Sequence, residues 1–265
     1  MNNTFTLTRF GLLLKRQWLE LGKFYLISFA VLFGVIVAVY GYANYLIMDA
    51  HRISTSSADF RVPLFFISGI LFTTIIASGY FAHLGQKSRA IFDLMIPAST
   101  FEKFLSAVFF TVVLGIFGFL VIFYVTDLVF LTKLRDWFMS TEKAGDSSNL
   151  NNFFPYFFNQ EHERLPIAVF ISPLLLTAVF LLGSIYFERF HYIKTALSVL
   201  IFSGLWTFML FKAGQILFEN KIPISRSQHF VQTKDTAEAL VTFAFVTLTL
   251  LFWAIAYVRL KEKEV

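Results

Sequence analysis

The chain has 265 residues, of which 57% are hydrophobic and only 15% are charged. Soluble domains carry about 45–50% apolar and about 25% charged residues, so this composition argues against a soluble enzyme built around one core. Disordered chains are poor in aromatic residues, whereas this chain has 36 Phe, 10 Tyr and 4 Trp, which excludes disorder. Because it has no Cys, it has no disulfide, thiolate metal site or cysteine nucleophile. The net charge is +5, but no run of five basic residues points to nucleic acid.

Six apolar stretches are predicted to be membrane-spanning helices, since about 20 mostly apolar residues cross the hydrocarbon core. They are residues 24–48, 63–82, 104–131, 165–187, 195–218 and 239–258. Each stretch is continuously apolar rather than alternating, which favours helices over barrel strands. The sequence therefore predicts an all-α polytopic membrane protein, with residues 1–265 forming a single transmembrane domain.

An even number of spans places both termini on the same side of the membrane. If that side is the cytoplasm, the inner segments hold 12 Lys and Arg residues and the outer loops hold 9. Positive residues favour cytoplasmic loops, and much of the outer count falls in the long loop 132–164, where this rule is weak. We therefore expect both termini to be cytoplasmic.

Residues 7–23 are predicted to form an amphipathic helix that lies in the membrane interface. Its apolar face carries Leu7, Phe10, Leu14, Trp18 and Leu21, and its polar face carries Arg9, Arg16, Glu20 and Lys23. The simpler interpretation is an anchor that orients the first span. The alternative is a lever that carries movement from a cytoplasmic partner into the membrane.

The inner loop 85–103 is predicted to form an elbow between the second and third spans. A short helix from Lys87 to Met95 ends at Pro97, because the residue before a proline is disfavoured in the helical conformation. Ser99 and Glu102 then match the capping box that starts a helix. Any tight connection between two spans needs such a stop and cap.

The elbow is also a candidate docking surface for a partner protein. Phe92 stands beside Asp93 on a short, charged segment, and an aromatic side chain flanked by charges is suited to binding a partner. The candidate partner-binding residues are Lys87, Ser88, Arg89, Ile91, Phe92, Asp93, Pro97, Ser99, Glu102 and Lys103.

Two ionisable residues fall within the predicted spans, Asp127 in the third and Lys212 in the fifth. Charges inside spans are costly and usually functional. Both lie near the outer ends of their spans, where they either pair with each other or extend to the outer interface.

Two further segments have open roles. The outer loop 132–164 contains an aromatic cluster at 153–158. We expect this cluster to lie on the outer leaflet of the membrane; the alternative is that it binds a ligand. Small residues recur every four positions at Gly69, Thr73 and Ala77, which predicts close helix contact in a dimer seam or within the bundle.

No catalytic or metal-binding motif is found in the sequence. The five histidines have no ligand spacing, and none is central in a span. Residues 85–88 resemble only the tail of a P-loop, because Gln86 separates the glycine from the lysine. We therefore expect this chain to bind no metal or cofactor and to hydrolyse no ATP.

The run from Leu94 to Leu105 reads Leu-Met-Ile-Pro-Ala-Ser-Thr-Phe-Glu-Lys-Phe-Leu. It resembles the inner-loop signature of bacterial ABC-transporter permeases of the six-span, type-2 exporter class. In that class an interfacial helix precedes the first span, and the loop between spans two and three forms a coupling helix that seats on a separate ATPase subunit. The chain departs from the class at 219–238, which is polar where the family often has short re-entrant helices.

The resemblance implies the permease subunit of an exporter in the bacterial cytoplasmic (inner) membrane. Its partners would be a P-loop ATPase subunit, which binds ATP and Mg, and a second permease copy or a homologue. The alternative is a non-transporting membrane scaffold or assembly subunit whose elbow docks another cytoplasmic protein. An intramembrane enzyme is disfavoured because the spans lack buried catalytic groups.

Overall fold

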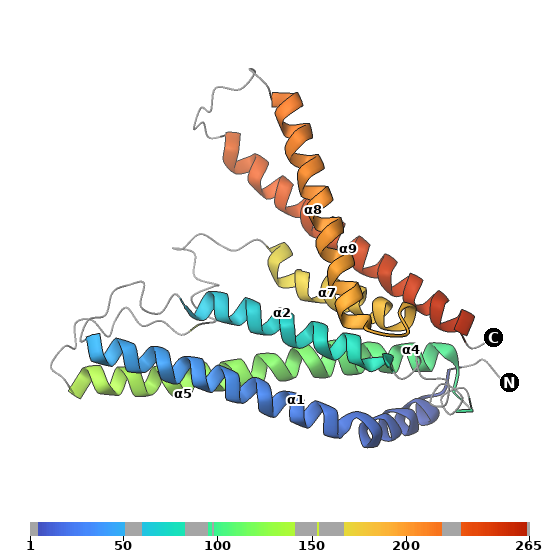
Figure 1. Ribbon diagram of the computed structural model, residues 1–265, viewed down its shortest axis with the longest axis horizontal. Coiled ribbons are helices and arrows are strands. Elements are labelled where there is room, and N and C mark those ends of the chain that lie inside the picture. The colour runs from blue at the N-terminus through green and yellow to red at the C-terminus, as the bar shows by residue number, and fades with distance from the viewer. Residues whose placement is uncertain are drawn as a thin grey trace. The chain divides into compact units, whose positions relative to one another are not determined.

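The computed structural model describes residues 5–50, 60–82, 95–96, 98–140, 153, 167–218 and 229–263, and the regular structure in these residues is helical (Figure 1). The elements are α1 (Leu7–Ala50), α2 (Arg61–Tyr80), α4 (Thr100–Val108), the π-helix η3 (Phe109–Leu114), α5 (Gly115–Ser140), α7 (Ile167–Tyr186), α8 (His191–Phe218) and α9 (His229–Lys263).

Among the described residues, six helical stretches are long and apolar enough to cross a membrane. They are Leu7–Asp49, Arg61–Tyr80, Thr100–Trp137, Ile167–Tyr186, His191–Met209 and Glu238–Lys263. Each overlaps one of the six spans predicted from the sequence. The prediction of an all-α polytopic membrane protein is therefore confirmed.

The chain divides into two compact units, which are described separately. Unit 1 comprises Met1–Ile76 and Ala98–Leu165, and unit 2 comprises Ala77–Pro97 and Pro166–Val265. Unit 1 contains α1, most of α2, and the continuous helical rod α4–η3–α5. Unit 2 contains α7, α8 and α9.

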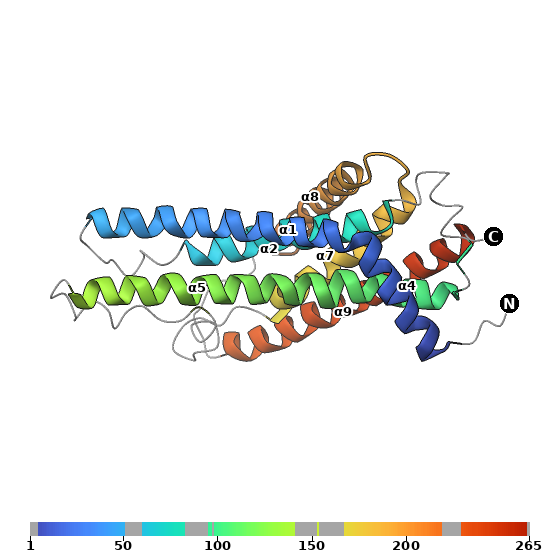
Figure 2. The same ribbon diagram turned by 90° about the horizontal axis from the view of Figure 1, so that it is seen from below.

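Helix α1 joins two elements that the sequence analysis separated, the interfacial helix 7–23 and the span 24–48. It runs without a break for 44 residues, because no proline or capping sequence interrupts it between them. At 1.5 Å per residue it is about 66 Å long, roughly twice the thickness of a hydrocarbon core. Figure 2 shows its N-terminal part, in dark blue, turning away from the rest of the helix.

The third span is also longer than predicted. The expected end at residue 131 is wrong, because α5 continues to Ser140 and makes the first nine residues of the predicted loop 132–164 helical. Leu131 and Leu134 are buried together against Ile47 and Met48 of α1. This contact provides an apolar face that favours further turns of α5.

Aromatic rings fill the centre of unit 1. The Phe65 ring of α2 lies 5.3 Å from Phe119 and 5.0 Å from Phe123 of α5, and Phe153 packs 4.9 Å from Phe123. Phe153 is only 2% exposed, so this residue of the predicted outer aromatic cluster is part of the core rather than of the lipid-facing surface. Ring pairs at these distances add about 0.5–1.5 kcal/mol beyond burial.

The small-residue stripe of α2 packs inside the chain at Gly69. A Cβ atom at this position would lie 2.9 Å from the Phe119 ring, which is closer than side chains normally approach. Thr73 is 1% exposed. Of the two predicted roles for the stripe, close packing within the bundle is the one seen at these residues.

In unit 2, α7 and α8 form a helical hairpin with a four-residue connection, residues 187–190. Phe190 ends the connection in the left-handed region, with φ of 55°, and its carbonyl accepts the Lys194 N–H at 3.0 Å. The two helices approach closely where Gly183 faces the side chain of Thr195. A side chain at residue 183 would overlap Thr195, so glycine is required there.

We predict that Gly183→Ala destabilises the protein by about 1–3 kcal/mol, because overpacking forces the α7 and α8 backbones apart. Thermal unfolding in detergent should show a Tm lower by about 2–4 °C per kcal/mol. Gly204→Ala on α8 is the matched control, since a Cβ there meets nothing within 4 Å. Adding Thr195→Ala should recover part of the loss; no recovery would contradict the overlap.

Candidate functional site

Most of the predicted elbow lies outside the described residues. Lys87, Ser88, Arg89, Ile91, Phe92, Asp93 and Pro97 belong to this part of the chain. The end of the elbow, where it enters the third span, is described and includes Ser99, Glu102 and Lys103. Lys103 is 4% exposed and Glu102 is fully buried, so the elbow enters the third span through charged residues that are not on the surface.

The capping box predicted from Ser99 and Glu102 is confirmed. The Ser99 hydroxyl accepts the Glu102 N–H at 3.2 Å, and the Glu102 Oε2 accepts the Ser99 N–H at 2.9 Å. These two bonds satisfy backbone donors that the first turn of α4 would otherwise leave free.

The same carboxylate also holds the N-terminus of the chain. Glu102 Oε1 accepts the Thr6 backbone N–H at 3.0 Å and Arg9 Nη2 at 3.2 Å. Arg9 Nε in turn donates to the Thr6 hydroxyl at 2.8 Å. We call Thr6, Arg9, Ser99 and Glu102 the Glu102 junction.

The Glu102 junction is a connection that the sequence analysis missed. Arg9 was assigned to the polar face of a surface helix, and no local pattern links it to a residue 93 positions later. A fully buried carboxylate is costly unless hydrogen-bonded and paired, and three donors from two distant segments meet this need. The Phe5 ring, 6.1 Å from Phe101, adds an apolar contact between the same segments.

A second buried carboxylate, Asp127 of α5, joins three helices of unit 1. Its Oδ1 accepts the Tyr40 hydroxyl of α1 at 2.8 Å and pairs with Arg61 Nη1 of α2 at 3.4 Å. Its Oδ2 accepts the Phe153 backbone N–H at 3.3 Å. Tyr40, Arg61 and Asp127 are 2%, 6% and 3% exposed. We call these four residues the Asp127 cluster.

The buried Asp127 carboxylate does not extend to an interface, and Arg61, which the sequence places in a loop, is a cation paired with it. The pairing of Asp127 with Lys212, an exposed residue of α8 in unit 2, stays a prediction, because the two units are described separately. One feature of the sequence points to the contact between Arg61 and Asp127. Arg61 stands two residues before an apolar span, so its side chain is close enough to enter the helix bundle.

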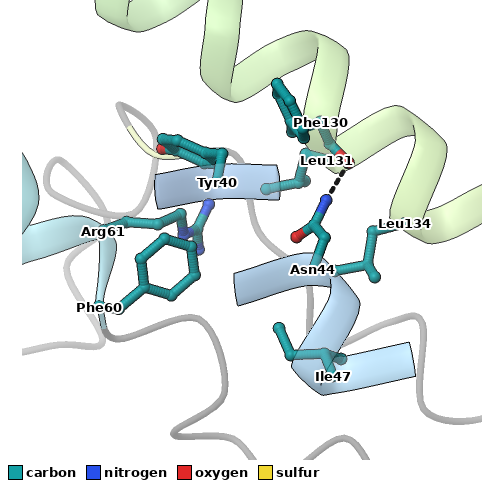
Figure 3. A pocket seen from close by; sticks show the side chains of 8 residues that line it. All are labelled: Tyr40, Asn44, Ile47, Phe60, Arg61, Phe130, Leu131 and Leu134. Atoms are coloured by element: carbon teal, nitrogen blue, oxygen red, sulfur yellow. Dashed lines mark hydrogen bonds between the residues drawn. The ribbon is translucent and has the colours of Figure 1, made fainter. Parts of the chain in front are cut away.

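A small cavity adjoins the Asp127 cluster. Its volume is about 10 Å³, which is space for one water molecule. Figure 3 shows its lining by Tyr40, Asn44, Ile47, Phe60, Arg61, Phe130, Leu131 and Leu134, with the Asn44 side chain bonded to the Phe130 carbonyl. This space is too small for an organic ligand. The bonds of Asp127 to Tyr40 and Arg61 hold α1, α2 and α5 together.

Within the described ranges, no group of three or more His, Asp or Glu residues could hold a metal ion. A scan against models of protein families, a search of curated proteins and a search of solved structures each found no match for the chain. Its function is therefore inferred from its own residues and contacts.

We predict that Glu102→Gln releases the N-terminal segment. The amide cannot keep the charge that attracts Arg9, and bonds to charged groups contribute about 1.5–3 kcal/mol each. Hydrogen exchange at the Thr6 amide should accelerate and the Tm should fall. Glu20→Gln is the control, because its ion pair with Arg16 is exposed and is worth about 0.5 kcal/mol or less. Equal effects of the two changes would contradict the junction.

Removing the charge of Asp127 alone should destabilise the protein more than removing the charges of both Asp127 and Arg61. Asp127→Asn takes from the buried Arg61 the carboxylate it is paired with, and breaking a buried ion pair by removing one partner costs about 3–5 kcal/mol. The double change Asp127→Leu with Arg61→Met should recover most of this, because well-packed apolar residues replace buried ion pairs at little cost. Thermal unfolding in lipid nanodiscs measures the stability of both variants, with Lys133→Met, at an exposed lysine of α5, as the control. A double variant no more stable than Asp127→Asn would show that the pair is not the source of the effect.

Proposed function

We propose that the chain is the membrane-spanning permease subunit of an ATP-driven exporter of the ABC type, with both termini in the cytoplasm of a bacterium and ATP hydrolysis on a separate subunit. The six apolar helices support a role within the membrane. The likeness of residues 94–105 to the inner-loop signature of the type-2 exporter class supports the particular role.

The observation that carries the proposal is the Glu102 junction. It links the start of α1 to the residues at which the elbow enters the third span. A helix that only anchors the chain at the membrane surface needs no bond to the elbow. A lever does need one, because movement of the elbow has to be transmitted to more than one span. The junction therefore favours the lever among the two interpretations of the N-terminal helix.

In the proposed mechanism, closure of two ATPase subunits on ATP displaces the 87–95 segment of the elbow. Ser99 and Glu102 begin α4 and move with it. Because Glu102 is bonded to Thr6 and Arg9, the N-terminal part of α1 moves together with α4. The first and third spans thus respond as rigid elements with two arrangements, and access to the export path alternates between them.

The proposal predicts that a stoichiometric P-loop ATPase copurifies with the tagged chain from its native membrane in mild detergent. Phe92→Ala with Asp93→Ala should remove the ATPase without lowering the Tm, because these residues form the predicted docking surface. Lys133→Ala with Asp136→Ala, exposed residues at the other end of the third span, is the matched control and should retain it.

A stable complex without any ATPase would contradict the exporter and would favour the scaffold. An ATPase that stays bound to the Phe92 and Asp93 variant would contradict the docking surface alone.

A further inference from the structure

The third span contains an irregular segment, the π-helix η3 between α4 and α5. A π-helical turn holds about one more residue than an α-helical turn and occurs frequently at functional sites. Phe110 and Thr111 in this segment are 2% and 1% exposed, and the Thr111 hydroxyl donates to the Ala107 carbonyl at 2.8 Å.

Within the described part of the chain, a buried tyrosine hydroxyl without a hydrogen-bond partner lies close to η3. The Tyr25 side chain of α1 packs its ring 5.8 Å from Phe110 and is 1% exposed. Its hydroxyl is buried and has no hydrogen-bond partner among the described residues. Nearly all buried polar groups are hydrogen-bonded, so a rearrangement of the neighbouring π-helix that supplies a partner would stabilise this hydroxyl.

The position of η3 limits what it can do. The Glu102 junction holds the start of the helical rod, and the Asp127 cluster holds the rod again 25 residues or about 37 Å further along. Between these two points of attachment, η3 is the place where the rod departs from α-helical geometry. A change in the number of residues per turn there would rotate and shift α4 relative to α5, and the N-terminal part of α1, which is bonded to Glu102, would move with α4.

We propose that η3 is a register switch. When the elbow moves, the π-helical turn shifts along the rod, and the Tyr25 hydroxyl then donates to a backbone carbonyl that the shift exposes. The switch connects movement of α4 and the N-terminal part of α1 to α5. The proposal rests on the proposed function only for the force that drives the shift.

Deletion of one residue tests whether η3 holds an inserted residue. Removing Val113, 52% exposed, should restore a regular helix with both flanks on their original faces, so the Tm should equal or exceed that of the wild type. Removing Val125, 50% exposed, is the control, because it turns Asp127 away from Tyr40 and Arg61 and should lower the Tm sharply. If both deletions lower the Tm equally, the switch is excluded.

Spin labels test the movement itself, and the absence of cysteine makes labelling specific. Leu12→Cys and Val121→Cys place labels at exposed sites on the N-terminal part of α1 and on α5. In the complex with the copurified ATPase, ATP with vanadate should shift the distance distribution. Deletion of Val113 should abolish the shift, and Tyr25→Phe should reduce the shifted population about two- to tenfold. Tyr42→Phe, at an exposed tyrosine of the same helix, should leave it unchanged.

A wild-type shift that persists after deletion of Val113 would overturn the register switch while leaving the exporter proposal intact. If no ATPase copurifies, the exporter proposal fails, and the labelled chain alone in nanodiscs decides the switch. Two distance populations, one of which is lost on deleting Val113, would support it, and a single population in the wild type would overturn it.

Discussion

The need of a buried carboxylate for hydrogen-bond donors organises unit 1. Neither Glu102 nor Asp127 is exposed to solvent, and a charge in such a place is stable only when donors surround it. Glu102 draws its donors from the N-terminus and from the start of α4, and Asp127 draws its donors from α1, α2 and Phe153. The apolar rings between the two carboxylates add packing energy. Because apolar contacts are not directional, they cannot determine which helix ends lie together. The two carboxylates do this, because a hydrogen bond requires a particular atom at a particular distance.

The helices themselves follow from local sequence. Long apolar runs predict spans wherever they occur, since the requirement is only length and composition, and all six predicted spans overlap described helices. The capping box at Ser99 was predictable for the same reason, because its two residues are three positions apart. The errors at the helix ends have one cause. Residues 132–140 and the junction of 7–23 with 24–48 lack a proline or cap, and hydropathy alone does not mark where a polar helix stops.

The contacts of the charged side chains were not predictable in this way. Arg9 and Glu102 are 93 positions apart, and Arg61 and Asp127 are 66 apart, so no spacing rule connects them. A net charge count treats Arg9 and Arg61 as surface residues, although both are paired with buried carboxylates. Depth in the membrane does not single out Arg61 as a partner of Asp127, because depth does not say which helices are neighbours. The π-helix was equally invisible, because its six residues are ordinary apolar residues with one threonine.

The Glu102 junction also has a consequence for biogenesis. Thr6 and Arg9 leave the ribosome long before Glu102 exists, and at about 5–20 residues per second the delay is about 5–20 s. Throughout that interval the cationic segment around Arg9 has no carboxylate to receive it, although its apolar side chains are already present. We expect an amphipathic helix in this situation to lie at a lipid headgroup surface until the third span is inserted. The order of synthesis would then give the N-terminal segment a temporary partner, the lipid, before its permanent one.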